Sequence, residues 1–346
     1  MNHPPRSLAV VGTTTWGTTI ALLAAQQGQP VALWARTPEE ARMLRRARQN
    51  RRFLPGYPFP SNLRVTCDLQ EAFGKAELVV FAVPSKALRE NVKRLGGALR
   101  EDALLISATK GLERSTGLRM SQVLQEELRD SLQDRLCVLS GPNLALEIAE
   151  GRPASTVVAC GNLEVGRTVQ QALMTPSFRV YTNSDVIGVE LAGALKNIIV
   201  LGAGIGDGLG YGNNSKAAFL TRGLAEITRL GVSAGANPLT FAGLAGMGDL
   251  IATAASPLSR NRYVGEQLAL GRSLQDVLAS MKNVAEGVDT TAAAVRMAEQ
   301  LGVEMPITRA TFRILFEGLS PQEAVNQLMG RAPRPEWSGI ASGPPP

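Results

Sequence analysis

The chain has 346 residues, 45% of them hydrophobic and 19% charged, and a formal net charge of +6. These values are typical of a soluble globular protein that is long enough for two domains with well-buried cores. The only histidine is His3, in a polar N-terminal segment. This excludes Ser-His-Asp and Cys-His nucleophiles and any dehydrogenase that uses a histidine as its acid or base.

The cysteines and the apolar runs indicate in which cellular compartment the protein works. Cys67, Cys137 and Cys160 are far apart in the sequence and odd in number. We therefore expect neither a disulfide framework nor a metal site, and a reducing cytoplasm is indicated. No signal peptide is visible, and no uninterrupted apolar stretch looks long enough to cross a bilayer. We expect a cytoplasmic protein without stable membrane insertion.

The N-terminal region reads as strand, turn, helix and strand. An apolar run over residues 8–11 ends at Gly12, a helical pattern runs from about Trp16 to Ala25, and a second apolar run covers residues 31–34. This order predicts the start of a nucleotide-binding βαβ unit. In such a unit, backbone N–H groups at the turn and the helix N-terminus hold a pyrophosphate.

The turn between the first strand and the helix reads Gly12-Thr13-Thr14-Thr15-Trp16-Gly17. It keeps the first and third glycines of the dinucleotide fingerprint G-x-G-x-x-G, but Thr14 stands at the second. A threonine there puts a branched side chain where the pyrophosphate would approach, although its hydroxyl could bond a phosphate oxygen. A plain strand-turn-helix corner stays open as the alternative.

The end of the second strand bears on the choice of nucleotide. An NAD site usually has Asp or Glu there to accept from the ribose 2′-OH, whereas this chain has Arg36. A guanidinium suits a 2′-phosphate. We therefore expect NADP as the preferred cofactor if the site is real, with NAD as the second choice.

Six arginines between residues 42 and 52 account for the positive charge, since the rest of the chain holds 30 basic and 30 acidic residues. Such a cluster could bind nucleic acid or a membrane surface. No aromatic interleaving or nucleic-acid motif accompanies it, so we interpret it as a solvated helix face that also enriches positive potential near a 2′-phosphate. We expect no nucleic-acid partner. The six are Arg42, Arg45, Arg46, Arg48, Arg51 and Arg52.

Strand-like and helix-like segments alternate as far as about residue 185. The candidate strands are 63–66, 78–83, 104–108, 136–139, 156–160 and 179–182, and the helical patterns are 37–48, 85–95, 118–132 and 163–173. This alternation predicts the α/β class, with a Rossmann-like, doubly wound, mainly parallel sheet and helices on both faces. Residues 53–60, rich in proline, are expected to wrap the surface as a loop.

Beyond residue 185 the patterns are helical. We expect a dinucleotide-binding domain over 1–185, an all-α substrate and catalytic domain over 186–330, and a disordered tail rich in proline and glycine over 331–346. Glycine occupies every second position from 202 to 212. This spacing cannot supply the phosphate-binding fingerprint, so we interpret it as a bend and a close helix-packing segment.

Lys196 and Asn197 lie in the middle of a helical segment that is apolar nearly all round. An unpaired buried ammonium is costly, so Lys196 must be paired, have a lowered pKa or face a polar cavity. One interpretation is a structural ion pair, for example with Glu190; the other is catalysis. With no usable histidine, Lys196 is the best candidate for general acid and base.

Two segments follow predicted strands and would line the same crevice in a doubly wound sheet. Lys110 follows the strand at 104–108, and alone it is also compatible with an ordinary surface lysine. Gly141 and Asn143 follow the strand ending at Leu139. We expect the backbone and the amide side chain there to contact a ligand.

A third cluster suits a phosphate monoester. Asp249 lies in the segment 248–253, and Ser259-Arg260-Asn261-Arg262 precedes another helical pattern. Arginine, serine and asparagine donors at a helix start place several charge-assisted hydrogen bonds on one dianion. Ser259 by itself is equally compatible with an ordinary helix N-cap.

Together these segments resemble bacterial-type NAD(P)-dependent glycerol-3-phosphate dehydrogenase over nearly the whole chain, up to about residue 333. The motifs that carry the resemblance are Gly12 to Gly17 with Trp16, Phe81-Ala82-Val83-Pro84-Ser85, Thr109-Lys110-Gly111-Leu112, Ser140-Gly141-Pro142-Asn143, Ala194-Leu195-Lys196-Asn197, Gly248-Asp249-Leu250, Ser259-Arg260-Asn261 and Val284-Ala285-Glu286-Gly287.

The resemblance implies a homodimeric cytoplasmic enzyme that reduces dihydroxyacetone phosphate to sn-glycerol 3-phosphate with NAD(P)H for glycerophospholipid synthesis. Lys196 would exchange the proton at the C2 oxygen, with Lys110, Asp249 and Asn197 around the reacting centre. Arg260 and Asn261 would hold the substrate phosphate, with Ser259, Gly141 and Asn143 as further substrate contacts. Cofactor contacts would come from Gly12, Thr14, Thr15, Trp16, Gly17, Arg36, Lys110, Ala145, Arg260, Val284 and Glu286.

Two residues depart from the family pattern. Thr14 replaces the usual second glycine, and Leu146 stands where the family usually has Lys or Arg. Two other functions stay open at this point: a non-catalytic NADP-binding sensor or scaffold, and a related reductase that acts on another substituted carbonyl compound.

Overall fold

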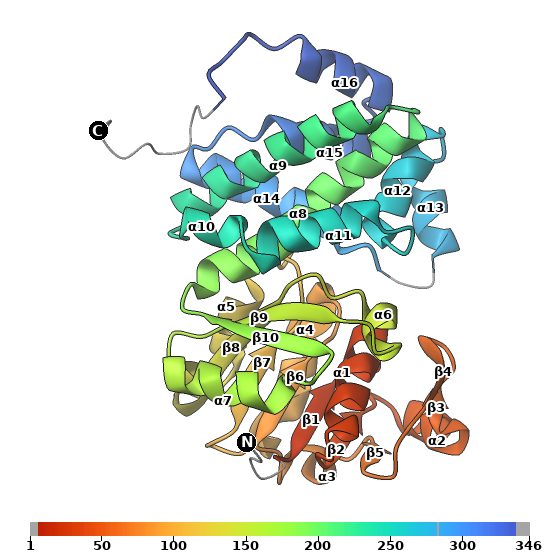
Figure 1. The fold of residues 1–346 in the computed structure, drawn as a ribbon, viewed down its shortest axis with the longest axis vertical. Coiled ribbons are helices and arrows are strands. Elements are labelled where there is room, and N and C mark those ends of the chain that lie inside the picture. The colour runs from red at the N-terminus through yellow and green to blue at the C-terminus, as the bar shows by residue number, and fades with distance from the viewer. Residues whose placement is uncertain (1–5, 282–283, 337–346) are drawn as a thin grey trace. The chain divides into compact units, whose positions relative to one another are not determined.

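A computed structural model describes residues 6–281 and 284–336. The chain divides into two compact units (Figure 1). The first holds the chain up to Thr109 together with Met120–Val186, and the second holds Lys110–Arg119 and the chain from Ile187. The expected division after residue 185 did not foresee that the short segment Lys110–Arg119 belongs to the second unit. His3 and residues 337–346 lie outside the described residues.

The first unit is built on an eight-stranded sheet in the order β10-β9-β8-β7-β6-β1-β2-β5. All neighbours are parallel except β8 and β9. The predicted α/β class with a mainly parallel sheet is confirmed. β1, β2 and β6 are apolar and buried along their whole length, as expected of strands whose two faces are both covered by helices. The strands are β1 (Leu8–Val11), β2 (Val31–Trp34), β5 (Leu63–Thr66), β6 (Leu78–Phe81), β7 (Leu104–Ser107), β8 (Leu136–Ser140), β9 (Ala154–Ala159) and β10 (Phe178–Asn183).

The helices of this unit connect the strands. They are α1 (Thr15–Gln26), α2 (Pro38–Ala47), α3 (Leu69–Phe73), α4 (Ser85–Leu95), η1 (Gly96–Ala98), α5 (Met120–Glu127), η2 (Asp130–Arg135), α6 (Ala145–Ala149) and α7 (Leu163–Leu173). The single helix expected over 118–132 is in fact α5 followed by the 3-10 helix η2.

The expectation of a surface loop over 53–60 was wrong. β4 (Leu54–Pro58) pairs antiparallel with β3 (Gln49–Asn50). Leu54 and Phe59 are buried in the main apolar core of this unit. A short strand is possible despite the prolines, because in a two-stranded sheet Pro58 lies at an edge where a missing N–H is tolerated.

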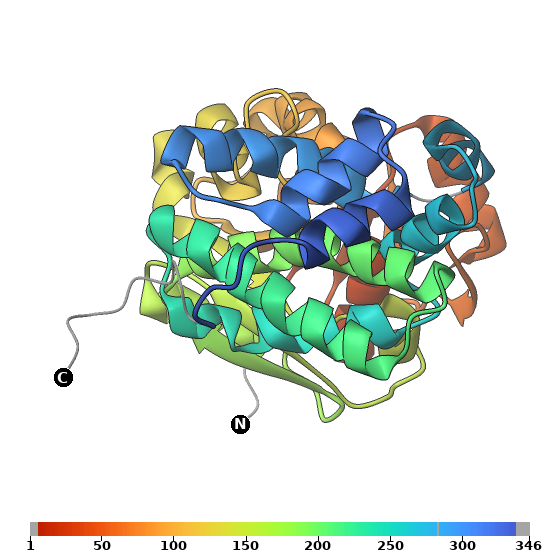
Figure 2. The ribbon, with the colours of Figure 1, turned by 90° about the horizontal axis from the view of Figure 1, so that it is seen from above.

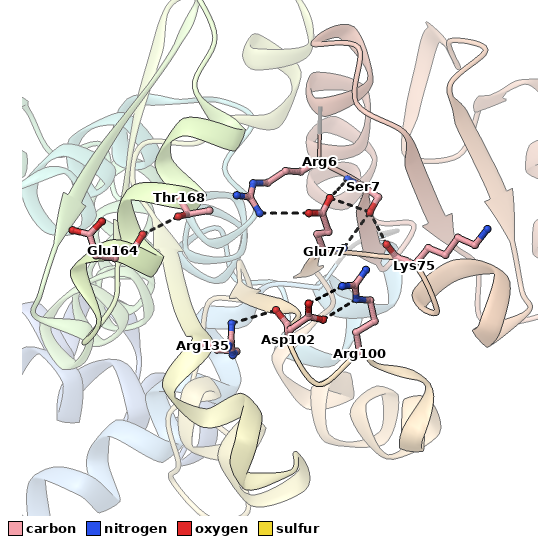
Figure 3. Close-up of polar contacts among 9 residues, drawn as sticks. All are labelled: Arg6, Ser7, Lys75, Glu77, Arg100, Asp102, Arg135, Glu164 and Thr168. Atoms are coloured by element: carbon pink, nitrogen blue, oxygen red, sulfur yellow. Dashed lines mark hydrogen bonds and ion pairs between the residues drawn. The ribbon is translucent and has the colours of Figure 1, made fainter. Parts of the chain in front are cut away.

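Near the amino-terminal ends of the strands, separate small sets of residues make polar contacts (Figure 3). The Ser7 backbone N–H, just before β1, donates to Glu77 Oε2 at 3.1 Å. Arg100 holds Asp102 through two hydrogen bonds of 2.8 and 2.6 Å, and Arg135 donates to the Asp102 carbonyl at 3.3 Å. These groups satisfy one another at the strand starts, so this end of the sheet serves structure.

The second unit is helical, as predicted. In Figure 2 α14 and α15, in blue, pack on each other and on α9, in green. Its elements are α8 (Val186–Gly208), α9 (Asn213–Ser233), α10 (Pro238–Phe241), the π-helix η3 (Leu244–Gly248), α11 (Asp249–Ala255), α12 (Arg260–Ala269), α13 (Leu274–Ser280), α14 (Glu286–Leu301), α15 (Pro306–Phe316) and α16 (Pro321–Met329).

The alternating glycines from 202 to 212 form the expected close-packing segment, and the expected bend lies only at its end. A Cβ on Gly204 would lie 2.0 Å from the Arg262 carbonyl oxygen, and one on Gly208 would lie 2.7 Å from the Glu266 carbonyl oxygen. Close packing of α8 on α12 is therefore confirmed. The expected bend is absent from residues 202–208, which continue α8, and the chain turns only beyond it, where Gly210 has φ +76°.

The described part of the expected tail is attached to the helical unit. Arg331 and Arg334 both pair with Glu304, and Arg222 donates to the Glu336 carbonyl at 2.7 Å. These exposed contacts join residues 331–336 to the helical unit, and the disorder of the tail stays a prediction.

Two helical stretches among the described residues, α8 and Pro238–Ala255, are long and apolar enough to cross a membrane by length and composition. Glu190 and Lys196 interrupt α8, and Asp249 interrupts the second stretch, so neither is an uninterrupted apolar run of the kind considered from the sequence. Of the most apolar part of α8, 83% is buried inside the protein. Packing against other helices accounts for its apolar character.

Candidate functional site

The turn between β1 and α1 depends on its two glycines. Gly12 has φ +117°, a conformation that favours glycine, and a Cβ there would lie 2.7 Å from the Ala82 carbonyl oxygen. A Cβ on Gly17 would lie 2.1 Å from the Gly12 carbonyl oxygen. The first and third positions of the fingerprint thus require glycine because the main chains of β1, α1 and the segment after β6 approach closely.

Thr14 has a structural role in this turn. It is the N-cap of α1, and its Oγ1 accepts from the Gly17 N–H at 3.0 Å and donates to the Ala82 carbonyl at 2.7 Å. Its φ of −67° needs no glycine. The hydroxyl proton is already used, so this arrangement does not provide the phosphate hydrogen bond considered from the sequence. Thr15 and Trp16 open the first turn of α1, where helix N–H groups lack intrahelical partners.

Five buried side-chain polar atoms of the first unit lack a hydrogen-bond partner among the described residues, and two of them belong to predicted site residues. One is Trp16 Nε1 and the other is Asn143 Oδ1. The Trp16 ring packs edge-on against Phe178, and Asn143 Nδ2 donates to Thr156 Oγ1 at 3.0 Å. Buried polar groups are normally satisfied. A donor and an acceptor left open at a nucleotide-type turn and after β8 fit a polar ligand.

Other predicted residues of this unit lie as follows. Gly141 has φ +148°, and its Cβ would lie 3.0 Å from Thr156 Cα, so only glycine suits this turn. Ala145 begins α6, and its carbonyl accepts from Thr19 of α1 at 3.3 Å. Arg36 is exposed after β2, and no carboxylate in the described part of the chain pairs with it. Nothing in the structure explains Leu146, which is partly exposed.

The arginine cluster is exposed, as expected, but only part of it lies on a helix. Arg42 pairs with Glu39 at 3.0 Å on α2. Arg52 lies in the turn after β3, with its guanidinium over the Phe53 ring. The cluster is therefore a solvated surface that spans α2 and the small β3–β4 sheet.

The second unit brings together the three predicted catalytic residues. Lys196 on α8 and Asp249 on α11 are 4% and 2% exposed. Lys196 Nζ lies 3.1 Å from Asp249 Oδ1, and Lys110 Nζ lies 2.6 Å from the other oxygen, Oδ2. The proposed partner Glu190 instead pairs with Arg119. One buried carboxylate thus holds two ammonium groups.

Thr253 is a fourth member that the sequence reasoning missed. Its Oγ1 accepts from Lys196 Nζ at 2.6 Å and donates to Asp249 Oδ1 at 3.0 Å. The signal was available, because residues four apart on a helix share a face and Thr253 follows Asp249 by four. The π-helix η3 precedes Asp249, and such π turns are frequent at functional sites.

Burial and charge set the protonation of this cluster. Burial lowers the pKa of Lys196 to about 8; the charges of Lys110 and Arg260 act in the same direction, and Asp249 opposes them. Burial works to raise the pKa of Asp249, but the two lysines hold it below its ordinary value. Asp249 is therefore ionised, and Lys196 is an ammonium that can release its proton near neutral pH.

A second set of contacts joins the predicted phosphate cluster to α8. Asn261 Nδ2 donates to Asn197 Oδ1 at 2.9 Å, and the Gly287 N–H donates to Asn261 Oδ1 at 3.0 Å. Arg260 donates to the Val284 carbonyl at 2.7 Å. Because Asn197 Oδ1 accepts, its NH₂ group is directed elsewhere as a donor.

Two members of the phosphate cluster have structural roles. Ser259 caps α12, accepting from the Arg262 N–H at 3.2 Å, as its N-cap interpretation predicted. Arg262 pairs with Asp207 at 2.6 Å, and Lys216 pairs with the same carboxylate. Arg262 is therefore not part of the site. Among the described residues no group of three His, Cys, Asp or Glu is arranged to hold a metal ion.

Comparison with known proteins decides the family. The N-terminal model of NAD-dependent glycerol-3-phosphate dehydrogenase matches residues 7–166, and the C-terminal model matches residues 185–326. The chain belongs to the NAD-dependent glycerol-3-phosphate dehydrogenase family. This confirms the resemblance carried by the sequence motifs.

Relatives within the family are similar over nearly their full length. A protein from Pelotomaculum thermopropionicum named glycerol-3-phosphate dehydrogenase (NAD(P)+) is 51% identical over 96% of this chain and 96% of its own. One of the same name from Dehalococcoides mccartyi is 49% identical over 96% and 93%. The crystal structure of glycerol-3-phosphate dehydrogenase from Coxiella burnetii is 36% identical, with a TM-score of 0.89 over 94% and 99%.

Proposed function

We propose that this member of the family is an NAD(P)-dependent oxidoreductase that reduces dihydroxyacetone phosphate to sn-glycerol 3-phosphate. The observation that carries the proposal is the buried cluster of Lys196, Lys110 and Asp249 in a chain about half identical to enzymes of that name. A ketone reductase needs a proton donor that is protonated at neutral pH and excluded from water, and Lys196 meets both conditions.

The cofactor we propose is NADPH, with NADH as the weaker alternative. When bound, it supplies the hydride. The turn between Gly12 and Gly17 and the backbone amides of Thr15 and Trp16 would hold the pyrophosphate. The Trp16 Nε1–H is a donor without a partner among the described residues. Ala145, Val284 and Glu286 are proposed as further contacts. Arg36, exposed and without a carboxylate partner among the described residues, would hold the 2′-phosphate.

Lys196 would give its proton to the C2 oxygen as negative charge develops there. Asp249 stabilises the ammonium form and, with Thr253, fixes the direction of Nζ. Lys110 shares Asp249 and places a second positive charge near the developing oxyanion. Asn197, oriented by Asn261, supplies an NH₂ donor toward the substrate.

The substrate phosphate would be held by Arg260 together with Asn261, at the start of α12, whose N-terminus favours an anion. Gly141 and Asn143 are further proposed contacts, Asn143 through its unpartnered Oδ1. We propose that the product supplies glycerophospholipid synthesis in the cytoplasm and that the enzyme is a homodimer.

The decisive test is NADPH oxidation with dihydroxyacetone phosphate by the wild type and by Lys196→Met. We expect a fall in kcat of about a thousand-fold, the usual size of a lost general acid. The matched control is Lys216→Met, since Lys216 also pairs with a carboxylate of the helical unit, Asp207, but outside the cluster. Activity that survives Lys196→Met would remove this lysine from its role.

Two further measurements separate the alternatives. NADPH binding by calorimetry without turnover on any phosphoketone would favour a non-catalytic sensor. Arg260→Ala should raise KM for a phosphorylated substrate by about a hundred-fold, the value of a lost charge-assisted contact. A reductase of unphosphorylated compounds would be indifferent to it. Arg36→Ser should weaken NADPH about ten-fold and leave NADH unchanged.

A further inference from the structure

Residues 110–119 form a closed loop that belongs to the helical unit although it follows β7 in the chain. Leu112 and Arg119 form an antiparallel bridge, the Glu113 N–H donates to the Leu118 carbonyl at 2.9 Å, and Leu112 is fully buried. The two ends of the loop are therefore coupled: a shift of Arg119 is transmitted to the backbone beside Lys110.

Arg119 joins this loop to α8. Its Nη1 lies 2.7 Å from Glu190 Oε2, and the two side chains are 15% and 2% exposed. Glu190 precedes Lys196 by six residues on the same helix, which corresponds to about 9 Å along the axis. A guanidinium–carboxylate pair shielded from solvent is screened little by salt and has a narrow range of geometries. The Arg119–Glu190 ion pair therefore fixes the position of the loop along the axis of α8.

Lys110 lies at the other end of the loop and contacts the catalytic carboxylate. Its Nζ is 2.6 Å from Asp249 Oδ2, while Lys196 uses Oδ1. Among the described residues, the charged groups that act on Lys196 are Asp249, Lys110 and Arg260. The position of Lys110 therefore sets the strength of its repulsion on the Lys196 ammonium. It also decides whether Asp249 pairs with both lysines or with Lys196 alone.

We propose that Arg119 and Glu190 are positioning residues for catalysis: their ion pair holds the 110–119 loop on α8 so that Lys110 stays on Asp249. Neither is assigned contact with substrate or cofactor. Further attachments of the loop lie at Arg114. Its side chain pairs with Asp289 at 3.1 Å and lies over the Phe316 ring but is 58% exposed, and its carbonyl accepts from Arg296. An exposed pair contributes little, whereas the Arg119–Glu190 pair is shielded from solvent and anchors the loop on α8.

The test rests on the proposed function and uses the full chain with NADPH and dihydroxyacetone phosphate. In Arg119→Met the loop loses its anchor and Lys110 moves from Asp249. Displacements of about an ångström near reacting groups cost up to about a hundred-fold, so we expect kcat/KM to fall about ten- to a hundred-fold. Since Lys110 lowers the pKa of Lys196, its withdrawal should move the alkaline limb of kcat/KM upward by about one pH unit.

Two variants control the result. Arg119→Lys keeps the charge. It should retain most of the wild-type kcat/KM, with the alkaline limb of the pH profile at its wild-type position. Arg309→Met removes another arginine from an ion pair of this unit, with Glu299 at 2.9 Å, and should change neither. Glu190→Gln, which preserves shape, replaces Arg119→Met if the latter does not fold. A folded variant with unchanged kcat/KM, or with reduced kcat/KM and an unmoved limb, would overturn the proposal.

A readout without turnover separates this inference from the proposed function. Reductive methylation of Lys110 and Lys196 across a pH series, followed by mass spectrometry, reports how readily each amine loses its proton. We expect Lys110 to become more reactive in Arg119→Met because it leaves the buried Asp249 and becomes more accessible, and Lys196 to react only at higher pH. Unchanged labelling overturns the positioning role, whereas a wild type inactive on dihydroxyacetone phosphate with altered labelling overturns only the reaction.

Discussion

The β1–α1 turn and the α8–α11 cluster build their chemistry in opposite ways. In the turn the main chain does the work: Gly12 and Gly17 are required because backbone atoms approach within distances that exclude a Cβ. In the cluster the chemistry comes from side chains: two ammonium groups pair with one carboxylate that is buried among packed apolar helices. A change in the turn should therefore act on affinity and stability, and a change in the cluster on protonation and rate.

Beyond the loss of Lys196 itself, the largest effect should come from Asp249→Asn, which leaves two lysines near one another without a carboxylate. We expect kcat/KM to fall at least about a hundred-fold. Because Asp249 raises the pKa of Lys196, its loss should move the alkaline limb of kcat/KM to lower pH, opposite to Arg119→Met. The measurement is a pH–rate profile of both variants.

The matched control for that change is Asp207→Asn. Asp207 also holds two cations, Lys216 and Arg262. Asp207→Asn should lower the free energy of unfolding and leave the alkaline limb of kcat/KM at its wild-type pH. Equal limb shifts in Asp207→Asn and Asp249→Asn would show that the cluster has no special control over Lys196.

Gly17→Ala should have an intermediate effect and test the other half of the comparison. Its Cβ would lie 2.1 Å from the Gly12 carbonyl oxygen, so the turn must open. Overpacking of this kind costs about 1–3 kcal/mol. We expect a lower denaturation midpoint and weaker NADPH binding by calorimetry, with the pH limb unmoved. Gly161→Ala, where open space surrounds the glycine, is the control; equal losses in both variants would contradict the close-approach argument.

Thr14→Val should have the smallest effect. It removes the hydroxyl that caps α1 and bonds the Ala82 carbonyl, while the branched shape is kept. Loss of an N-cap costs about 1 kcal/mol, measured as a drop in the thermal midpoint. Thr14→Ser keeps the hydroxyl and should match the wild type. A midpoint unaffected by Thr14→Val would mean that the cap contributes nothing.

Much of the fold could be predicted because burial leaves a direct trace in the sequence. The apolar runs at β1, β2 and β6 are fully buried strands, and α8 is apolar all round because other helices enclose it. The errors occurred where local composition misled. The prolines of β4 suggested a loop where a short strand forms. The glycines from 202 to 212 suggested a bend, which is confined to the last of them because α8 continues to Gly208.

The sequence by itself determined the class of fold, the glycine turn and the need for Lys196 to be compensated, because each follows from local pattern or from the cost of a buried charge. Only the tertiary structure decided the partners: Asp249, 53 residues from Lys196, rather than Glu190, and the Thr14 hydroxyl on Ala82, 68 residues away. Contacts over such separations depend on how helices and strands pack, and no local pattern encodes them.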